Sequence, residues 1–185
     1  MTAVTTTTGL PFSRPLNRAD LEDLPDDGHR YELIDGTLIV SPGPELPHQD
    51  MVGNLHVLLR AACPPHLKVV LAPFDVVLAD DTVLQPDLLV ALREQFTRRE
   101  LPGAPLLAVE VLSPSTRRVD LLLKRDRLQE AGAPSYWLVD PDAPSVTVLE
   151  LREGRYEQVA YGVGDEVVEV LQPFPVTLVA SALLD

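Results

Sequence analysis

The chain has 185 residues, of which 45% are hydrophobic, a length that suits one domain with a substantial core and is short for two. Its 28 acidic and 15 basic residues give a formal net charge of −13 at pH 7, which argues against broad, non-specific attraction to the phosphates of nucleic acid. No segment is long and apolar enough to span a membrane, and the N-terminal segment lacks the charged and then apolar order of a secretory signal. We therefore expect a cytoplasmic protein with a flexible tail at 1–15 and a single domain at 16–185.

The first predicted elements are a short helix and a hairpin. The segment LNRADLEDLPDD has the pattern of a short amphipathic helix, with Asn17 as a plausible N-cap and Pro25 as its end. The segment YELIDGTLIV, residues 31–40, contains two alternating apolar runs joined by Asp35 and Gly36. This dipeptide supplies the positive φ angles of a tight turn, so a hairpin is predicted here.

A longer helix and several strands follow. Apolar residues recur at helical spacing through 48–62, which predicts a helix packed on a sheet. The runs KVVLAPFDVVLA and VLQPDLLVAL, separated by residues 80–82, and then the run LLAVEVL, are apolar enough to predict strands that are covered on both faces. The sheet is therefore expected to be central.

The rest of the chain predicts a crossover and further strands. Residues 120–131 have amphipathic helical spacing, Gly132 can end this helix, and SYWLVD follows as a strand. A strand, a helix and a strand in succession predict a crossover unit. The runs SVTVLEL, RYEQVAY and EVVEVL predict short strands joined by turns. The fold class is thus α/β with a mixed sheet.

Two acidic residues lie among apolar neighbours. Glu110 lies within LLAVEVL, and Asp87 in QPDLLV is predicted to lie in the middle of a strand. Because an unpaired buried charge is costly, such groups are normally paired, neutralised or bound to metal. If the two strands are adjacent, the carboxylates can converge and share a hard divalent cation such as Mg²⁺, or Mn²⁺. The cation would remove the repulsion that otherwise raises one pKa.

Two further residues are candidates for the same site. Glu32, at the start of the hairpin, could reach the two acids through water, and Lys124 could point its ammonium group into the acidic cluster. Acids that hold a water-activating metal, together with a lysine that orients the water or stabilises charge on phosphorus, suit phosphodiester hydrolysis.

Each of these residues also has a purely structural interpretation. Asp87 could accept hydrogen bonds from the backbone of a turn, and Glu110 could pair with an arginine such as Arg117. Glu32 and Lys124 could belong to an exposed strand start and an exposed helix face.

The histidine and the clustered basic residues carry weaker signals. His48, at the start of a predicted helix, is more typical of a cap region or a surface than of a ligand. Five basic residues lie close together after Glu110 and could give an acidic protein a local positive rim: Arg117, Arg118, Lys124, Arg125 and Arg127.

The ordered motifs RYELIDGTLIVSP, HQDMVGNLHVLL, FDVVL, QPDLLV, VEVLSPST and LKRDRLQEAGAPSYWLVD resemble the PD-(D/E)XK nuclease superfamily and, within it, the Uma-two family of restriction-endonuclease-like proteins. The resemblance covers most of the chain and implies a restriction-endonuclease-like central mixed β-sheet flanked by helices. It implies that Asp87 is the metal-binding aspartate, Glu110 the second acid and Glu32 an additional glutamate. The chain departs from the superfamily pattern at Leu112, where the lysine usually stands. Lys124 is similar to the displaced lysine of the Uma-two pattern.

The resulting hypothesis is a Mg²⁺-dependent endonuclease acting on nucleic acid, with DNA favoured. Asp87 and Glu110 would be the metal ligands, with Lys124 and Glu32 as further catalytic residues. Two alternatives stay open: a catalytically silent nuclease-fold binding protein, favoured by the net charge and the displaced lysine, and a metal-dependent hydrolase of smaller phosphate esters. The resemblance also implies a homodimer.

Overall fold

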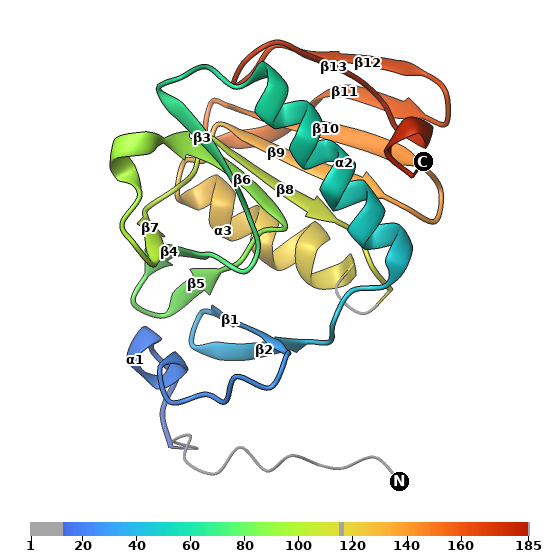
Figure 1. Ribbon diagram of the computed structural model, residues 1–185. Helices are drawn as coiled ribbons and strands as arrows, with labels where there is room; N and C mark the ends of the chain where they lie inside the picture. Colours follow the sequence, from blue (N-terminus) through green and yellow to red (C-terminus); the bar gives the residue numbers. More distant parts are fainter. Residues whose placement is uncertain (1–12, 115–116, 185) are drawn as a thin grey trace, which may run out of the picture.

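The computed structural model describes residues 13–114 and 117–184 (Figure 1). The helices and helical turns are α1 (Arg18–Leu21), α2 (Leu46–Ala62), η1 (Arg93–Gln95), η2 (Val119–Lys124), α3 (Arg125–Glu130) and η3 (Ser181–Leu183). The strands are β1 (Arg30–Ile34), β2 (Thr37–Ser41), β3 (Leu67–Leu71), β4 (Asp75–Ala79), β5 (Thr82–Leu84), β6 (Leu88–Leu92), β7 (Glu100–Pro102), β8 (Leu107–Val111), β9 (Ser135–Asp140), β10 (Ser145–Arg152), β11 (Arg155–Val163), β12 (Val167–Val170) and β13 (Val176–Val179). Among the described residues, no helix has the length and apolar character needed to cross a membrane.

The predicted N-terminal tail falls mainly outside the described residues. Its first twelve residues are not described, and Arg14, at the start of the described chain, forms an ion pair with Asp20 at 2.8 Å. Asn17 caps α1, as predicted, by accepting a hydrogen bond from the backbone of Ala19. The single domain at 16–185 stays a prediction.

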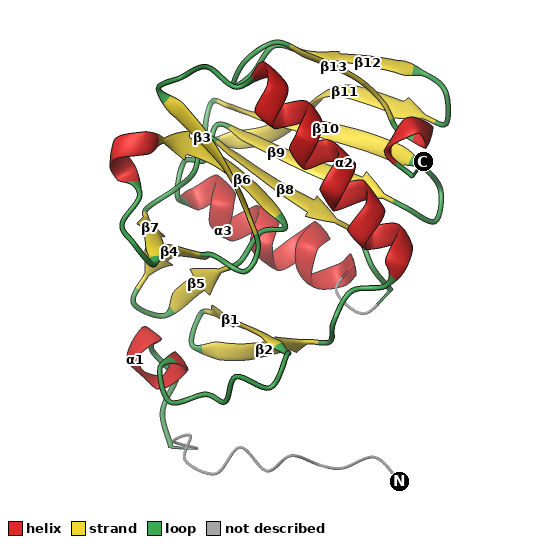
Figure 2. Cartoon of the chain, viewed as in Figure 1, coloured by secondary structure: helices red, strands yellow, loops and turns green. Residues whose placement is uncertain are grey.

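A six-stranded mixed sheet forms the centre of the fold (Figure 2). Its strand order is β11-β10-β9-β8-β6-β3. Strands β8 and β9 are parallel, and the other neighbours are antiparallel. The segments η2 and α3 connect the two parallel strands, so the predicted crossover and the mixed α/β fold are confirmed.

Helices cover both faces of this sheet. Successive residues of a strand point to opposite faces, so each face presents apolar side chains that a helix can cover. On one face, Met51, Leu55 and Leu59 of α2 are fully buried at helical spacing against sheet residues that include Val109 and Trp137. On the other face, α3 packs its buried side chain against a separate cluster. Pro64 and Pro65 follow α2 and favour its end there.

A second sheet of five strands has the order β2-β1-β5-β4-β7, so the predicted strands do not all join one central sheet. The apolar runs around residues 67–79 and 82–92 each contain one proline, Pro73 or Pro86, where the run divides into strands of different sheets. Proline has no N–H to donate to a sheet ladder, which explains both breaks. The β1–β2 hairpin is confirmed, with φ of 51° at Asp35 and 73° at Gly36.

Three local predictions need correction. Asp87 lies in a bend immediately before β6, not in the middle of a strand. The helix predicted at 120–131 begins earlier, since residues 117 and 118 are already helical and lead into the π-helical segment η2, and α3 ends at Glu130, two residues before the positive-φ Gly132. Strand β7, which pairs with β4, and strand β13, which pairs with β12, were not predicted.

Candidate active site

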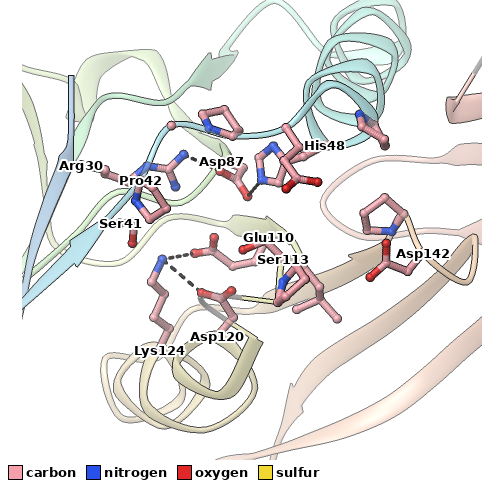
Figure 3. Close-up of a pocket in the computed structure, with 17 residues that line it drawn as sticks. Arg30, Ser41, Pro42, His48, Asp87, Glu110, Ser113, Asp120, Lys124 and Asp142 are labelled. Atoms are coloured by element: carbon pink, nitrogen blue, oxygen red, sulfur yellow. Dashed lines mark hydrogen bonds and ion pairs between the residues drawn. The ribbon is translucent and has the colours of Figure 1, made fainter. Parts of the chain in front are cut away.

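A pocket lies where β6 begins and β8 ends, beside the start of α2 (Figure 3). Its lining comes from β1, the loop after β2, the start of α2, the approach to β6, the end of β8, η2 and the loop after β9. The buried ionisable side chains that line it are His48, Asp87, Glu110, Asp120 and Lys124. Segments far apart in the sequence therefore bring their charged groups to one place.

The sheet register brings the two embedded acids together. Strands β6 and β8 are antiparallel, with Leu88 opposite Val109. In an antiparallel pair, the residue before Leu88 faces the residue after Val109, which places Asp87 opposite Glu110. The two residues are only 3% and 1% exposed. The adjacency of their strands, on which the sequence argument depended, is confirmed.

Lys124 lies among three carboxylates. Its Nζ is 2.9 Å from Glu32 Oε1, 3.1 Å from Glu110 Oε1 and 3.3 Å from Asp120 Oδ1, and all four side chains are at most 2% exposed. Glu32 Oε1 also accepts a hydrogen bond of 2.7 Å from the backbone N–H of Gln85. The exposed positions allowed for Glu32 and Lys124 are therefore wrong, and Glu32 meets the lysine directly rather than through water.

Asp87 is held by three donors. Arg30 Nη2 contacts Oδ1 at 2.8 Å, while Oδ2 accepts the backbone N–H of Val111 at 2.8 Å and lies 3.2 Å from His48 Nε2. Burial by itself would raise the pKa of Asp87, but the hydrogen bond with His48 and the charge of Arg30 lower it to about 2. Asp87 is therefore an ionised carboxylate of fixed orientation.

Glu110 and Lys124 shift each other's protonation. Burial raises the pKa of Glu110 well above its usual range, against the opposing charge of Lys124, and the charges of Asp120, Asp87 and Glu32 add to the rise. Burial would lower the pKa of Lys124, but the charges of Glu110, Glu32 and Asp120 together raise it. Lys124 is therefore a protonated cation within a group of acids that it does not fully neutralise.

We call Glu32, Asp87, Glu110 and Asp120, together with Arg30 and Lys124, the acidic cluster. Its four carboxylates face two cations, so a largely buried site holds an excess of acids, and the charges of the neighbouring acids add to the raised pKa of Glu110. Either a proton on Glu110 or a bound cation would offset this excess of negative charge. A divalent cation would balance this charge, and the available donors are carboxylate oxygens, which Mg²⁺ prefers. Within the described residues, no group of three or more His, Cys, Asp or Glu side chains is arranged to hold a metal ion. A cation on Asp87 and Glu110 would thus keep several waters, as Mg²⁺ commonly does.

Comparison with known proteins gives the family. A family model described as "Uma2: Putative restriction endonuclease" matches residues 18–182. The chain belongs to the Uma2 family. The resemblance drawn from the ordered motifs is therefore confirmed, and the family description supports a nuclease.

A solved structure has the same fold as this Uma2 chain. It is described as "a putative nuclease belonging to DUF820 from Anabaena variabilis ATCC 29413", and it is similar with a TM-score of 0.70 and 21% sequence identity. The match covers 92% of this chain and 98% of that chain. At this identity the likeness shows the fold alone, which confirms the α/β fold class. No curated protein matches the chain.

Three residues of the Uma2 site were not found from the sequence: Arg30, His48 and Asp120. Arg30 stands two residues before Glu32 on β1, so both side chains lie on the same face of the strand. Asp120 stands four residues before Lys124, a spacing at which helical side chains meet. These two spacings could have pointed to Arg30 and Asp120 in the sequence. They indicate site residues, however, only once Glu32 and Lys124 are known to be buried.

The predicted positive rim of the Uma2 chain is largely neutralised. Arg117 pairs with Asp140 at 2.7 Å and not with Glu110. Arg125 pairs with its neighbour Asp126 at 3.2 Å, Arg127 pairs with Glu130 at 2.7 Å, and Lys124 is buried. Exposed positive charge around the pocket is therefore smaller than the sequence indicates.

Proposed function

We propose that this Uma2 protein is a Mg²⁺-dependent endonuclease that hydrolyses phosphodiester bonds of nucleic acid, with DNA as the favoured substrate. The observation that carries the proposal is the excess of acids in the acidic cluster, where four carboxylates face two cations. Such a buried excess is costly without a further positive charge, and a divalent cation supplies it. The family description and the nuclease-like fold point to the same reaction.

Asp87 and Glu110 are the proposed ligands of the cation, which Mn²⁺ could replace. Lys124 contacts Oε1 of Glu110 and leaves Oε2 for coordination, while Asp87 is ionised because its pKa is about 2. When bound, Mg²⁺ would lower the pKa of a coordinated water and polarise a phosphoryl oxygen.

Lys124 and Glu32 have supporting roles in this proposal. The lysine contacts Glu110 and Glu32 at the same time, so it fixes the orientation of a proposed ligand and offsets part of the local negative charge. Glu32 also accepts the backbone N–H of Gln85, in the segment just before Asp87. It thereby ties β1 to the approach of β6, and with it the position of Asp87.

The test is calorimetric titration of Mg²⁺ and Mn²⁺ into wild type, Asp87→Asn, Glu110→Gln and the control Asp126→Asn. Asp126 is a half-exposed acid paired with Arg125 outside the pocket, so its variant matches the loss of charge without touching the site. We expect the first two substitutions to abolish binding and the control to retain it. The same proteins are then assayed for cleavage of plasmid and single-stranded DNA. If wild type binds neither ion even with DNA present, the protein is a catalytically silent fold.

Two finer parts of the proposal have separate tests. DNA as the substrate requires binding that falls steeply with salt, because bound phosphates release counterions, whereas a smaller phosphate ester would show a shallow dependence. We also propose a homodimer, as the resemblance implies, since two copies can cut both strands of a duplex. Sedimentation velocity at increasing protein concentration tests this state.

A further inference from the structure

The buried cation of the pocket has no donor left for a substrate. A lysine ammonium group has three N–H donors, and Lys124 lies within 3.3 Å of three carboxylates. Its side chain is only 2% exposed. Turning one N–H toward a phosphate would leave a buried carboxylate without that partner, which carries a large penalty.

Arg30 differs from Lys124 in both respects. Its side chain is 21% exposed and lines the pocket. The hydrogen bonds of the described residues use two of its N–H groups, Nη2 with Asp87 at 2.8 Å and Nη1 with the backbone carbonyl of Gln85 at 3.2 Å. A guanidinium has five N–H donors and stays charged, so three donors remain for a ligand.

The position of Arg30 suits a phosphate bound next to Asp87. Figure 3 shows the guanidinium beside the Asp87 carboxylate, whereas the Lys124 ammonium group lies beside Glu110 and Asp120. The planar fork of arginine matches the oxygens of a phosphate in two parallel hydrogen bonds. The acids of the pocket would repel a phosphate group, and Arg30 is the partly exposed cation that can offset this repulsion.

We propose that Arg30 binds the phosphate group that is cut, whereas Lys124 acts only by holding the acids in position. This inference rests on the proposed nuclease function and names the side chain that contacts its substrate. It therefore separates the two cations of the acidic cluster into a phosphate-binding residue and a positioning residue.

The test combines a protein variant with a ligand variant. A fluorescent ten-nucleotide DNA, as a single strand and as a duplex, is compared with the same DNA carrying neutral methylphosphonate linkages. Binding is measured by fluorescence polarisation in Ca²⁺, a hard cation that also takes oxygen ligands. Wild type is compared with Arg30→Gln, Arg30→Lys and the control Arg125→Gln. Arg125 is half-exposed and paired with Asp126 outside the pocket, so the control removes the same charge elsewhere.

We expect wild type to prefer the phosphate DNA and Arg30→Gln to lose about tenfold or more of that preference, since a hydrogen bond to a charged group has this worth. Arg30→Lys should lose less, and Arg125→Gln should change the preference by less than about twofold, because an exposed charge is screened. Calorimetry should show that Arg30→Gln still binds Mg²⁺. If the substitution misplaced the proposed ligand Asp87, Mg²⁺ binding would be lost.

Three results would overturn the inference. An unchanged preference in Arg30→Gln would show that Arg30 does not contact the phosphate, while wild-type binding would leave the nuclease proposal standing. Loss of Mg²⁺ binding in Arg30→Gln would show that the arginine only orients Asp87. Failure of wild type to bind either form of the DNA would remove the proposed function itself, and the role of Arg30 with it.

Discussion

The replacement of Lys124 by methionine tests whether its charge stabilises the fold. Methionine has a similar length and no charge, so the substitution leaves Glu32, Glu110 and Asp120 buried without the ammonium group that now lies 2.9 to 3.3 Å from them. Removing one partner of a buried ion pair typically costs about 3–5 kcal/mol. Since small proteins are stable by only about 5–15 kcal/mol, we expect a loss of about a fifth or more of the free energy of unfolding.

The loss should depend on pH with a definite sign. The charge of Lys124 opposes the raised pKa of Glu110, so without the lysine the pKa of Glu110 in the folded state rises further and the folded state binds more protons. A raised folded pKa of an acid means that stability decreases as pH rises. The difference between wild type and Lys124→Met should therefore be largest near pH 7.5 and smaller near pH 5.

Urea denaturation at both pH values measures these free energies. The control is Lys68→Met, which removes the chain's other lysine, an exposed residue that lies 5.4 Å from the ring centre of Phe96. An exposed cation over an aromatic ring contributes about 0.5–1 kcal/mol, so the control should lose no more than that. If Lys124→Met loses less than the control at pH 7.5, or loses the same amount at both pH values, the reasoning about this charge is refuted.

Three further predictions concern the surroundings of the site. Tyr136→Phe removes a buried hydroxyl that donates to the backbone carbonyl of Asp120 at 2.9 Å and should cost about 1–2 kcal/mol in urea denaturation, whereas an unchanged midpoint would contradict the importance of this bond. Asp87 has a pKa lowered to about 2, so the stability it contributes, about 2 kcal/mol, is present above about pH 4 and is lost as pH falls toward 2. The advantage of wild type over Asp87→Asn should therefore shrink over this range in acid-dependent unfolding, and a constant difference would argue against the shift. Gly36→Ala should lower the thermal midpoint more than Gly154→Ala, because both residues have positive φ but only at Gly36 would a β-carbon meet Pro15, at 2.5 Å; equal losses would show that the contact relaxes freely.

The local sequence pattern was sufficient to predict most of the helices and strands. The apolar spacing of Met51, Leu55 and Leu59 predicts α2, and Asp35 with Gly36 predicts the β1–β2 turn. Both signals are local, because a helix face and a tight turn depend on residues a few positions apart. Strand β13 was missed because it lies beyond the last predicted run, and its pairing with β12 is set by tertiary packing.

The same reasoning found only part of the site. Glu110 and Asp87 attract attention because an acid among apolar neighbours is unusual, and the prediction that their strands are adjacent is confirmed. Arg30 follows a polar segment, and Asp120 stands at the start of a predicted amphipathic helix, where an acid is ordinary. Their importance comes from contacts with Asp87 and Lys124, which lie 57 and 4 residues away along the chain.

The sequence by itself determined most of the secondary structure and the presence of two embedded acids, since periodicity and turn residues act over short distances. It also contained the ordered motifs whose resemblance to the Uma2 family predicted the family of the chain. Only the tertiary structure decided that Glu32 is buried against Lys124 and that the strands divide into separate sheets. The physical reason is that burial and ion pairing depend on which distant segments pack together, and the charge of the site is a property of that assembly rather than of any one motif.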